Sequence, residues 1–152
     1  MLEVHFRLAN TADVDLLIGF MQQFYEIDQY PFDEPIAREA LQTLIEESSL
    51  GRVWIIDRKS EAIGYIAVTF GYSLEFHGRD AIIDEFFLTA PHRNQGIGKE
   101  ALQFVCEECR HLGIHALHLE VERTNEVAQA LYGKMGFEPH EQRYLMSRWL
   151  AM

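Results

Sequence analysis

The stretch DEFFLTAPHRNQGIGKEAL, residues 84–102, leads from an apolar strand into a helix through a turn that contains two glycines. Residues 81–88 are rich in the aromatic and branched side chains typical of strands. After the turn, apolar residues recur three or four positions apart as far as Leu112. This spacing predicts a helix that Gly113 ends.

The turn between this strand and this helix is suited to an anionic ligand. The first N–H groups of a helix lack intrahelical acceptors and lie at the positive end of its dipole. Gly96 and Gly98 would let a pyrophosphate approach the backbone, and Arg93 and Lys99 would add charge-assisted hydrogen bonds. The glycine spacing matches neither the dinucleotide-binding pattern nor the P-loop.

The composition is that of a globular protein, and the length of 152 residues suits a single domain, 1–152. The formal net charge of −11 would repel a phosphate backbone, so we expect no nucleic-acid partner. We find no apolar run that could span a membrane and no leader-like start, and therefore expect a cytoplasmic protein without a membrane partner. Acidic residues are concentrated between Asp13 and Glu47. They form either a solvated helix face or the rim of a site that attracts a cationic substrate.

The periodicity of the chain predicts strands that alternate irregularly with helices. Strands are expected at residues 4–8, 53–57, 63–70, 81–88, 114–121 and 144–150. Helices are expected from a cap at Asn10 or Thr11 to before Pro31, from Asp33 to before Gly51, from the glycine turn to Gly113, and over 125–135. Such a mixture of hairpin and crossover connections predicts a mixed sheet with helices on both faces.

Cysteines and histidines do not indicate a redox or metal site. Cys106 and Cys109 fall on the apolar stripe of a predicted helix, so they are interpreted as core residues. His115 and His118 would face opposite sides of a strand. We therefore expect no metal.

Two segments of the chain resemble one known family. Asp84–Leu88 followed by RNQGIG at 93–98 resembles motif A of the GNAT superfamily, the acyl-CoA-dependent N-acyltransferases. NEVAQALYGKMGF at 125–137 resembles motif B of the same family. The motifs depart from the family pattern at Pro91, which stands one place late, and at Asn94, where glycine is common.

This resemblance spans the chain and implies a fold. A GNAT-like α/β fold has a mixed, mostly antiparallel central sheet of six to seven strands with helices on both faces. A splayed parallel pair of strands in that sheet forms a notch for coenzyme A.

The resemblance also implies acetyl-CoA (coenzyme A) as co-substrate, bound by the strand end, the glycine turn and the motif B helix. A backbone N–H of the strand would polarise the thioester carbonyl. The implied cofactor-binding residues are Phe87, Leu88, Thr89, Arg93, Asn94, Gln95, Gly96, Ile97, Gly98, Lys99, Asn125 and Tyr132.

Two carboxylates compete for the role of general base. Glu85 aligns with an acidic residue that many family members carry, and is interpreted as the base, acting through a water. Asp84 is the alternative, because the polyamine acetyltransferase branch has a carboxylate pair here. Strand alternation places these two acids on opposite faces unless a bulge intervenes. Tyr132 stands where the family places a general acid for the departing thiolate.

The amine substrate would enter over the first two helices and the 71–79 loop, where aromatic residues alternate with acids. Polyamines, aminoglycosides, lysine side chains and protein N-termini fit this composition equally well, and packing of the helices on the sheet is the other explanation for the aromatic residues. The candidate substrate-binding residues are Tyr25, Glu26, Asp28, Tyr30, Phe32, Tyr72, Glu75 and Asp84.

The resemblance therefore implies an acetyl-CoA-dependent N-acetyltransferase, acting on a primary amine of a small cationic molecule or peptide by direct attack in a ternary complex. One alternative is a non-catalytic acyl-CoA-binding sensor module. Another is a toxin-like acetyltransferase acting on charged tRNA, which the acidic balance disfavours. Many relatives pair through the sheet edge, so we expect a homodimer.

Overall fold

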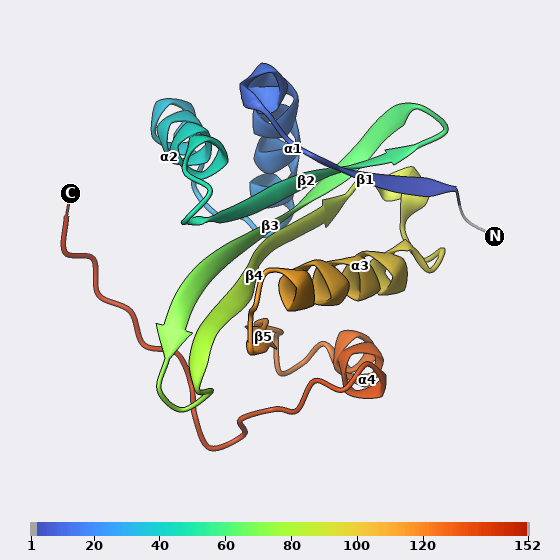
Figure 1. Ribbon diagram of the computed structural model, residues 1–152. Helices are drawn as coiled ribbons and strands as arrows, with labels where there is room; N and C mark the ends of the chain where they lie inside the picture. The colour runs from blue at the N-terminus through green and yellow to red at the C-terminus, as the bar shows by residue number, and fades with distance from the viewer. Residues whose placement is uncertain (1–2, 152) are drawn as a thin grey trace. The chain divides into compact units, whose positions relative to one another are not determined.

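A single mixed sheet dominates the computed structural model, which describes residues 3–151. Its five strands lie in chain order, the first four antiparallel and the last pair parallel (Figure 1). They are β1 (Val4–Leu8), β2 (Gly51–Arg58), β3 (Glu61–Ser73), β4 (Gly78–Leu88) and β5 (Ala116–His118).

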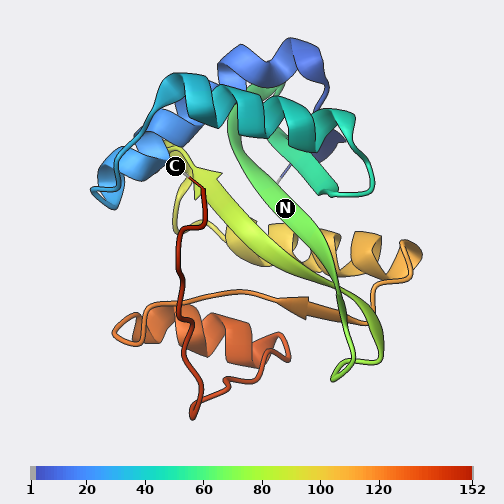
Figure 2. The same ribbon diagram turned by 90° about the vertical axis from the view of Figure 1, so that its left-hand side faces the viewer.

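Helices cover both faces of this sheet, as Figure 2 shows. Two helices, α1 (Val14–Ile27) and α2 (Glu34–Glu46), lie on one face, and α3 (Ile97–His111) lies on the other. Asn10 caps the short 3₁₀ helix η1 (Thr11–Asp13) that leads into α1, and Asp33 caps α2 by accepting from the Ile36 N–H. The predicted start of α2 is therefore confirmed, whereas Asn10 caps η1 and α1 itself begins at Val14.

The core has two main parts, one on each face of the sheet. Beneath α1 and α2, the buried side chains include Leu17, Ile55 and Tyr65. Against α3, they include Trp54 and Val68 on the sheet, together with buried Val105 and Cys109 of the helix. Cys109 is thus a core residue, as predicted.

Strand β4 contains a β-bulge at Asp84. Ala67 of β3 pairs with Glu85, but the next residue, Val68, pairs with Ile83, so Asp84 has no partner in this ladder. Ile83 and Phe86 both pack against the core part on the α3 face, although strict alternation would put residues three apart on opposite faces. Asp84 and Glu85, the two residues between them, consequently both lie on the face of the sheet that α1 covers.

The chain divides into two compact units, one that ends at Glu120 and one that begins at Val121. In the second unit, helix α4 (Glu126–Lys134) starts at Asn125, whose side chain accepts from the Ala128 N–H at 3.1 Å. Gly136, with φ of 95°, ends this helical region.

The predicted fold class is confirmed, but two predicted strands were wrong in extent or existence. The sheet has five strands instead of six to seven, because residues 144–150 form no strand and 114–121 is reduced to β5. The apolar residues of 144–150 favour extended backbone, yet a strand also needs a ladder partner. Residues 144–150 have no such partner in the described chain, and their large apolar side chains are exposed.

Candidate active site

Glu85 of β4 lies at the centre of a group of aromatic side chains. The Tyr25 hydroxyl, from α1, donates to Glu85 Oε2, and the Tyr65 hydroxyl, from β3, donates to Glu85 Oε1 at 2.7 Å. Both carboxylate oxygens therefore accept a hydrogen bond from a phenol. The sequence predicted Glu85 and Tyr25 as site residues but not Tyr65. Tyr65 lies twenty positions before Glu85, and no sequence motif connects the two.

Burial dominates the electrostatics of this group. It raises the pKa of Glu85, while the hydrogen bonds from Tyr25 and Tyr65 act in the opposite direction by favouring the carboxylate. Burial, together with the neighbouring carboxylates, also raises the pKa of both tyrosines far above their ordinary value. Burial and the neighbouring carboxylates thus favour the neutral, protonated form of both phenols.

Asp84 belongs to the same face as Glu85 because of the bulge. The charge of Asp84 contributes to the raised pKa of Glu85, Tyr25 and Tyr65, which is consistent with a position close to all three. Its own side chain reaches solvent, and partial desolvation by surrounding protein raises the pKa of this carboxyl. The two acids thus form one carboxylate pair with an exposed member and a shielded member.

Aromatic rings surround the shielded carboxylate. The Tyr25 ring meets Phe32 edge-on with centroids 5.4 Å apart and Phe24 at 5.9 Å. Phe24 and Tyr65 in turn contact Phe87 of β4. Of the predicted substrate-binding residues, Tyr25, Phe32 and Asp84 are therefore brought together around Glu85.

The other predicted substrate-binding residues lie elsewhere. Glu26, Asp28 and Tyr30 are exposed at the end of α1 and in the segment that follows it. Tyr72 lies five residues along β3 from the partner of Glu85, about 17 Å at ordinary strand rise, and Glu75 lies in the turn beyond it. The predicted 71–79 loop is instead the end of β3, a turn and the start of β4, and within the first unit it is separate from the carboxylate pair.

Strand β4 has an open edge next to this site. Its parallel pairing with β5 ends at Ile82, opposite His118. The Thr89 N–H donates to Ile63 O on the β3 side, so the ladder alternation turns the backbone groups of Phe86 and Leu88 towards the other edge. The open edge therefore presents the N–H of Leu88, whereas Leu88 O already accepts from Arg93 Nε at 2.8 Å.

The glycine turn follows β4 directly and leads into α3, whose first residues have no side-chain cap. Asn94 and Gly96 adopt left-handed backbone conformations, with φ of 60° and 85°. No side chain caps α3 at Gly96, and a Cβ added at Gly98 would make only an ordinary contact of 3.7 Å with Phe86. The N–H groups at the start of α3 hence remain available to an anion.

Side chains of the turn mostly hold the turn itself. The Arg93 guanidinium lies over the Phe87 ring, 5.6 Å from its centroid, and the Ile97 side chain is buried. Gln95 Nε2 donates to Pro91 O at 2.8 Å, while Gln95 Oε1 accepts from Arg58 Nη1 at 2.7 Å. Arg58, at the end of β2, was missed by sequence reasoning because nothing in its local sequence connects it to the turn.

The acetyltransferase (GNAT) family model matches residues 20–137, a range that contains the carboxylate pair, the open edge and the uncapped helix. The chain belongs to the GNAT family. The resemblance noted in motifs A and B is thereby confirmed, and so is the expectation that the chain is an acyltransferase of the N-acetyltransferase type.

Similarity to individual proteins agrees with this GNAT assignment. The chain is 25% identical over 115 residues to a candidate ribosomal protein bS18-alanine N-acetyltransferase of Bacillus subtilis (strain 168), covering 76% of this chain and 72% of that protein. It is 33% identical to an integron cassette protein from the mobile metagenome of Cole Harbour Salt Marsh, with a TM-score of 0.84 over 97% of this chain and 91% of that one.

A second solved structure shares the fold at lower identity. It is named as a predicted acetyltransferase with acetyl-CoA from Clostridium acetobutylicum, with 17% identity and a TM-score of 0.78 over 95% of this chain and 96% of that one. The residues of this GNAT chain suit the same ligand, because an open strand edge runs into an uncapped, glycine-containing helix start.

The second unit of this GNAT chain carries the motif B residues. Tyr132 is half-buried on α4, which raises the pKa of its phenol, and its ring meets Phe137 edge-on with centroids 6.1 Å apart. The Asn125 side chain is engaged as the cap of α4. Both residues thus have a local structural role within their own unit.

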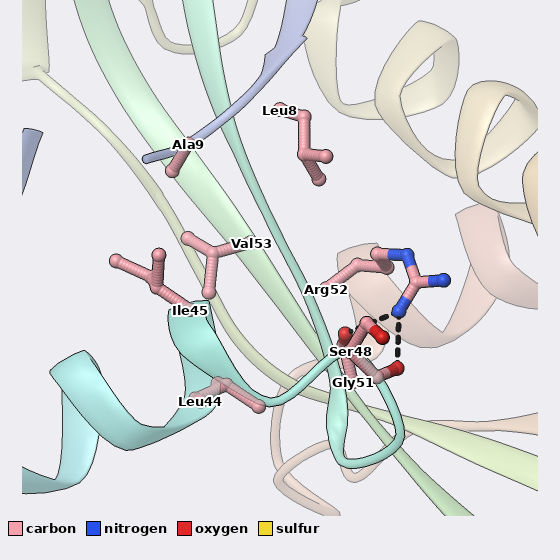
Figure 3. Close-up of a pocket in the computed structure, with 8 residues that line it drawn as sticks. All are labelled: Leu8, Ala9, Leu44, Ile45, Ser48, Gly51, Arg52 and Val53. Carbon is pink, nitrogen blue, oxygen red and sulfur yellow. Dashed lines mark hydrogen bonds between the residues drawn. The ribbon is translucent and has the colours of Figure 1, made fainter. Parts of the chain in front are cut away.

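Other features of this GNAT chain lack comparable chemistry. A cavity of about 140 Å³ lies between α2 and strands β1 and β2. Figure 3 shows its lining residues, among which Arg52 donates to the carbonyl oxygens of Ser48 and Gly51. No carboxylate lines this cavity. Within residues 3–151, no cluster of three metal-ligand side chains is found, and no helix is both long and apolar enough to cross a bilayer.

Proposed function

We propose that this GNAT protein transfers the acetyl group of acetyl-CoA to a primary amine of a small cationic molecule or peptide, by direct attack in a ternary complex. The observation that carries the proposal is the position of Glu85. It is a partly desolvated carboxylate, held by two phenols, on the strand that runs directly into an uncapped helix start.

Acetyl-CoA would supply the acyl group as a thioester. The N–H groups at the start of α3 would bind its pyrophosphate, and Arg93 and Lys99 lie on the turn and first helical residues as nearby positive charges. The open edge of β4 would hold the pantetheine arm. The Leu88 N–H, which points to that edge, is the donor best placed for the thioester carbonyl.

Glu85 would act as the general base, and Asp84 would attract the cationic amine. A base must be ionised and shielded, and Glu85 meets both needs because its hydrogen bonds favour the carboxylate that burial disfavours. Asp84 reaches solvent on the same face and can pair with a substrate ammonium. By their place in motif B, Tyr132 would donate the proton that the departing sulfur needs and Asn125 would contribute to binding of the cofactor.

The experiment that tests this function is a turnover assay that follows thiol release from acetyl-CoA. The amines should include a polyamine, an aminoglycoside, a lysine peptide and a peptide that begins with alanine, since one similar protein is named as a ribosomal protein bS18-alanine N-acetyltransferase. We expect turnover with one amine class, and its loss in Glu85→Gln. Binding of CoA without turnover on any of these amines would instead support a non-catalytic sensor module.

A further inference from the structure

Both oxygens of the Glu85 carboxylate are occupied by phenol hydroxyls, from Tyr25 and Tyr65. An amine that approaches Glu85 from the side of Tyr25 therefore meets the phenol oxygen before it meets Oε2. The two phenols differ in access: Tyr65 is 2% exposed beneath the helices, whereas Tyr25 is only half-buried. Of the two, Tyr25 is the one that a substrate can reach.

The position of Tyr25 is suited to receive a proton. Its hydroxyl gives its own hydrogen to Glu85 Oε2, which leaves the lone pairs of the phenol oxygen free to accept from an N–H group. Phe32 packs edge-on against its ring, and Asp84 shares the same face of the sheet. An ammonium attracted by Asp84 would thus be brought next to the Tyr25 hydroxyl.

We propose that Tyr25 is a catalytic residue that relays the proton of the attacking amine to Glu85, while Tyr65 only positions the carboxylate. This proposal rests on the function proposed above. It replaces a bridging water by a protein side chain between the amine and the base.

The relay balances in protons and bonds. The bound ammonium first releases one proton to solvent. As the neutral amine nitrogen then forms its bond to the acetyl carbon, the carbon–sulfur bond breaks and the electron pair leaves with the sulfur. The N–H proton moves to Tyr25 Oη while the Tyr25 proton moves to Glu85 Oε2, so Tyr25 remains neutral and Glu85 becomes neutral. The sulfur takes one proton from its acid, which regains a proton from solvent, and Glu85 later returns one proton to solvent.

The surroundings of Tyr25 favour such a concerted transfer over a free tyrosinate. Tyr25 donates to the Glu85 carboxylate, is influenced by the charge of Asp84 and packs against two apolar rings, so a further negative charge there would be strongly disfavoured. The phenol therefore passes one proton on as it accepts another.

Tyr25→Phe and Tyr65→Phe form a matched pair that tests the relay. Each variant removes one hydroxyl and one hydrogen bond to Glu85, so both should shift the acidic limb of the rate profile to higher pH. Above that limb, we expect Tyr25→Phe to lower kcat by about 100-fold, as for loss of an acid–base group. Tyr65→Phe should lower it by only about fivefold, as for loss of one positioning hydrogen bond. The KM for acetyl-CoA should change little in both.

Solvent isotope effects add a readout that a purely structural role would leave unchanged. In mixtures of H₂O and D₂O, the wild-type kcat should depend non-linearly on deuterium content because two protons move together, and this dependence should become linear in Tyr25→Phe. Equal losses of kcat in the two variants, with unchanged isotope effects, would overturn the relay and leave the acetyltransferase function standing. A wild-type protein that binds CoA but acetylates none of the amines would overturn both proposals.

Discussion

Glu85 shows how one residue's environment sets the pH range of the proposed reaction. Burial raises the pKa of Glu85, and the group must be ionised to act as a base. Activity should therefore be fully present above this raised pKa and should fall as the pH drops through it, at a higher pH than for an ordinary glutamate. A profile of kcat/KM against pH would measure the limb, and a limb at or below the ordinary range for glutamate would contradict the prediction.

The variant Glu85→Gln should separate activity from stability. We expect kcat to fall by about 100-fold or more, because the base is lost. Since the folded state binds a proton at Glu85 more tightly than the unfolded state, the ionised carboxylate weakens the wild-type fold as the pH rises. The melting temperature of the variant relative to wild type should consequently increase from acidic to neutral pH. A constant difference would show that Glu85 does not titrate differently on folding.

At the level of single residues, sequence reasoning identified the acids but not their partners. Glu85 and Asp84 can be recognised from the sequence because a carboxylate inside an apolar strand requires a polar partner or a functional role. Tyr65 looks like an ordinary inward-facing strand residue, and only the register of β3 against β4 places it at Glu85. Alternation alone would have separated the two acids, since no local signal in the sequence reveals the bulge.

Among the elements, the β3–β4 ladder depends on Gly64. A Cβ at this position would overlap the carbonyl oxygen of Phe87, which is backbone and cannot rotate away. Gly64→Ala should therefore destabilise the fold by about 2 kcal/mol or more and distort β4 beside the open edge. Denaturant unfolding would measure the free energy, with CoA affinity measured alongside.

The control for Gly64→Ala is Gly19→Ala, the same chemical change in α1. Nothing lies within 4 Å of a Cβ added at Gly19, and its backbone is helical. This variant should gain roughly 0.5–1 kcal/mol from helix propensity. Equal effects of the two substitutions would show that the close approach at Gly64 has no energetic role.

The glycine turn depends on a strand end that is distant in sequence. Arg58 of β2 contacts His92 Nδ1 at 3.2 Å and holds Gln95, so Arg58→Ala should loosen the turn and weaken CoA binding by about fivefold. Arg52→Ala is the matched control, because Arg52 lies on the same strand but bonds Ser48 and Gly51 instead. Calorimetric titration with CoA would measure both, and equal affinities in the two variants would argue against a role for Arg58.

At the level of elements, the strand–turn–helix unit was predictable and the end of the chain was not. The start of α3 follows from glycines and apolar periodicity within one stretch of sequence. A strand at 144–150 would require a partner, and the choice of partner is a property of the whole sheet. Local propensity therefore gave the correct type for the central elements and the wrong type for the last one.

For the whole molecule, the net charge of −11 and the acidic first two helices should assist a cationic amine. Electrostatic steering raises the association rate of an oppositely charged substrate and is screened by salt. We expect kcat/KM for a polycationic amine to fall several-fold between low and high salt, with kcat nearly constant. A singly charged amine of similar size is the control, and equal salt dependence for both would exclude steering.

The bulge at Asp84 also divides β4 into two modules with independent constraints. On the hairpin side, residues 78–83 must match β3 and β5 in one alternation, and on the catalytic side, residues 85–88 follow the opposite alternation. Substitutions that exchange inward-facing and outward-facing residues in one module do not change which residues of the other module face the core. The hairpin can therefore diverge in evolution while Glu85 keeps its orientation, and deletion of Asp84 alone would give one regular alternation in which Glu85 still lies on the α1 face.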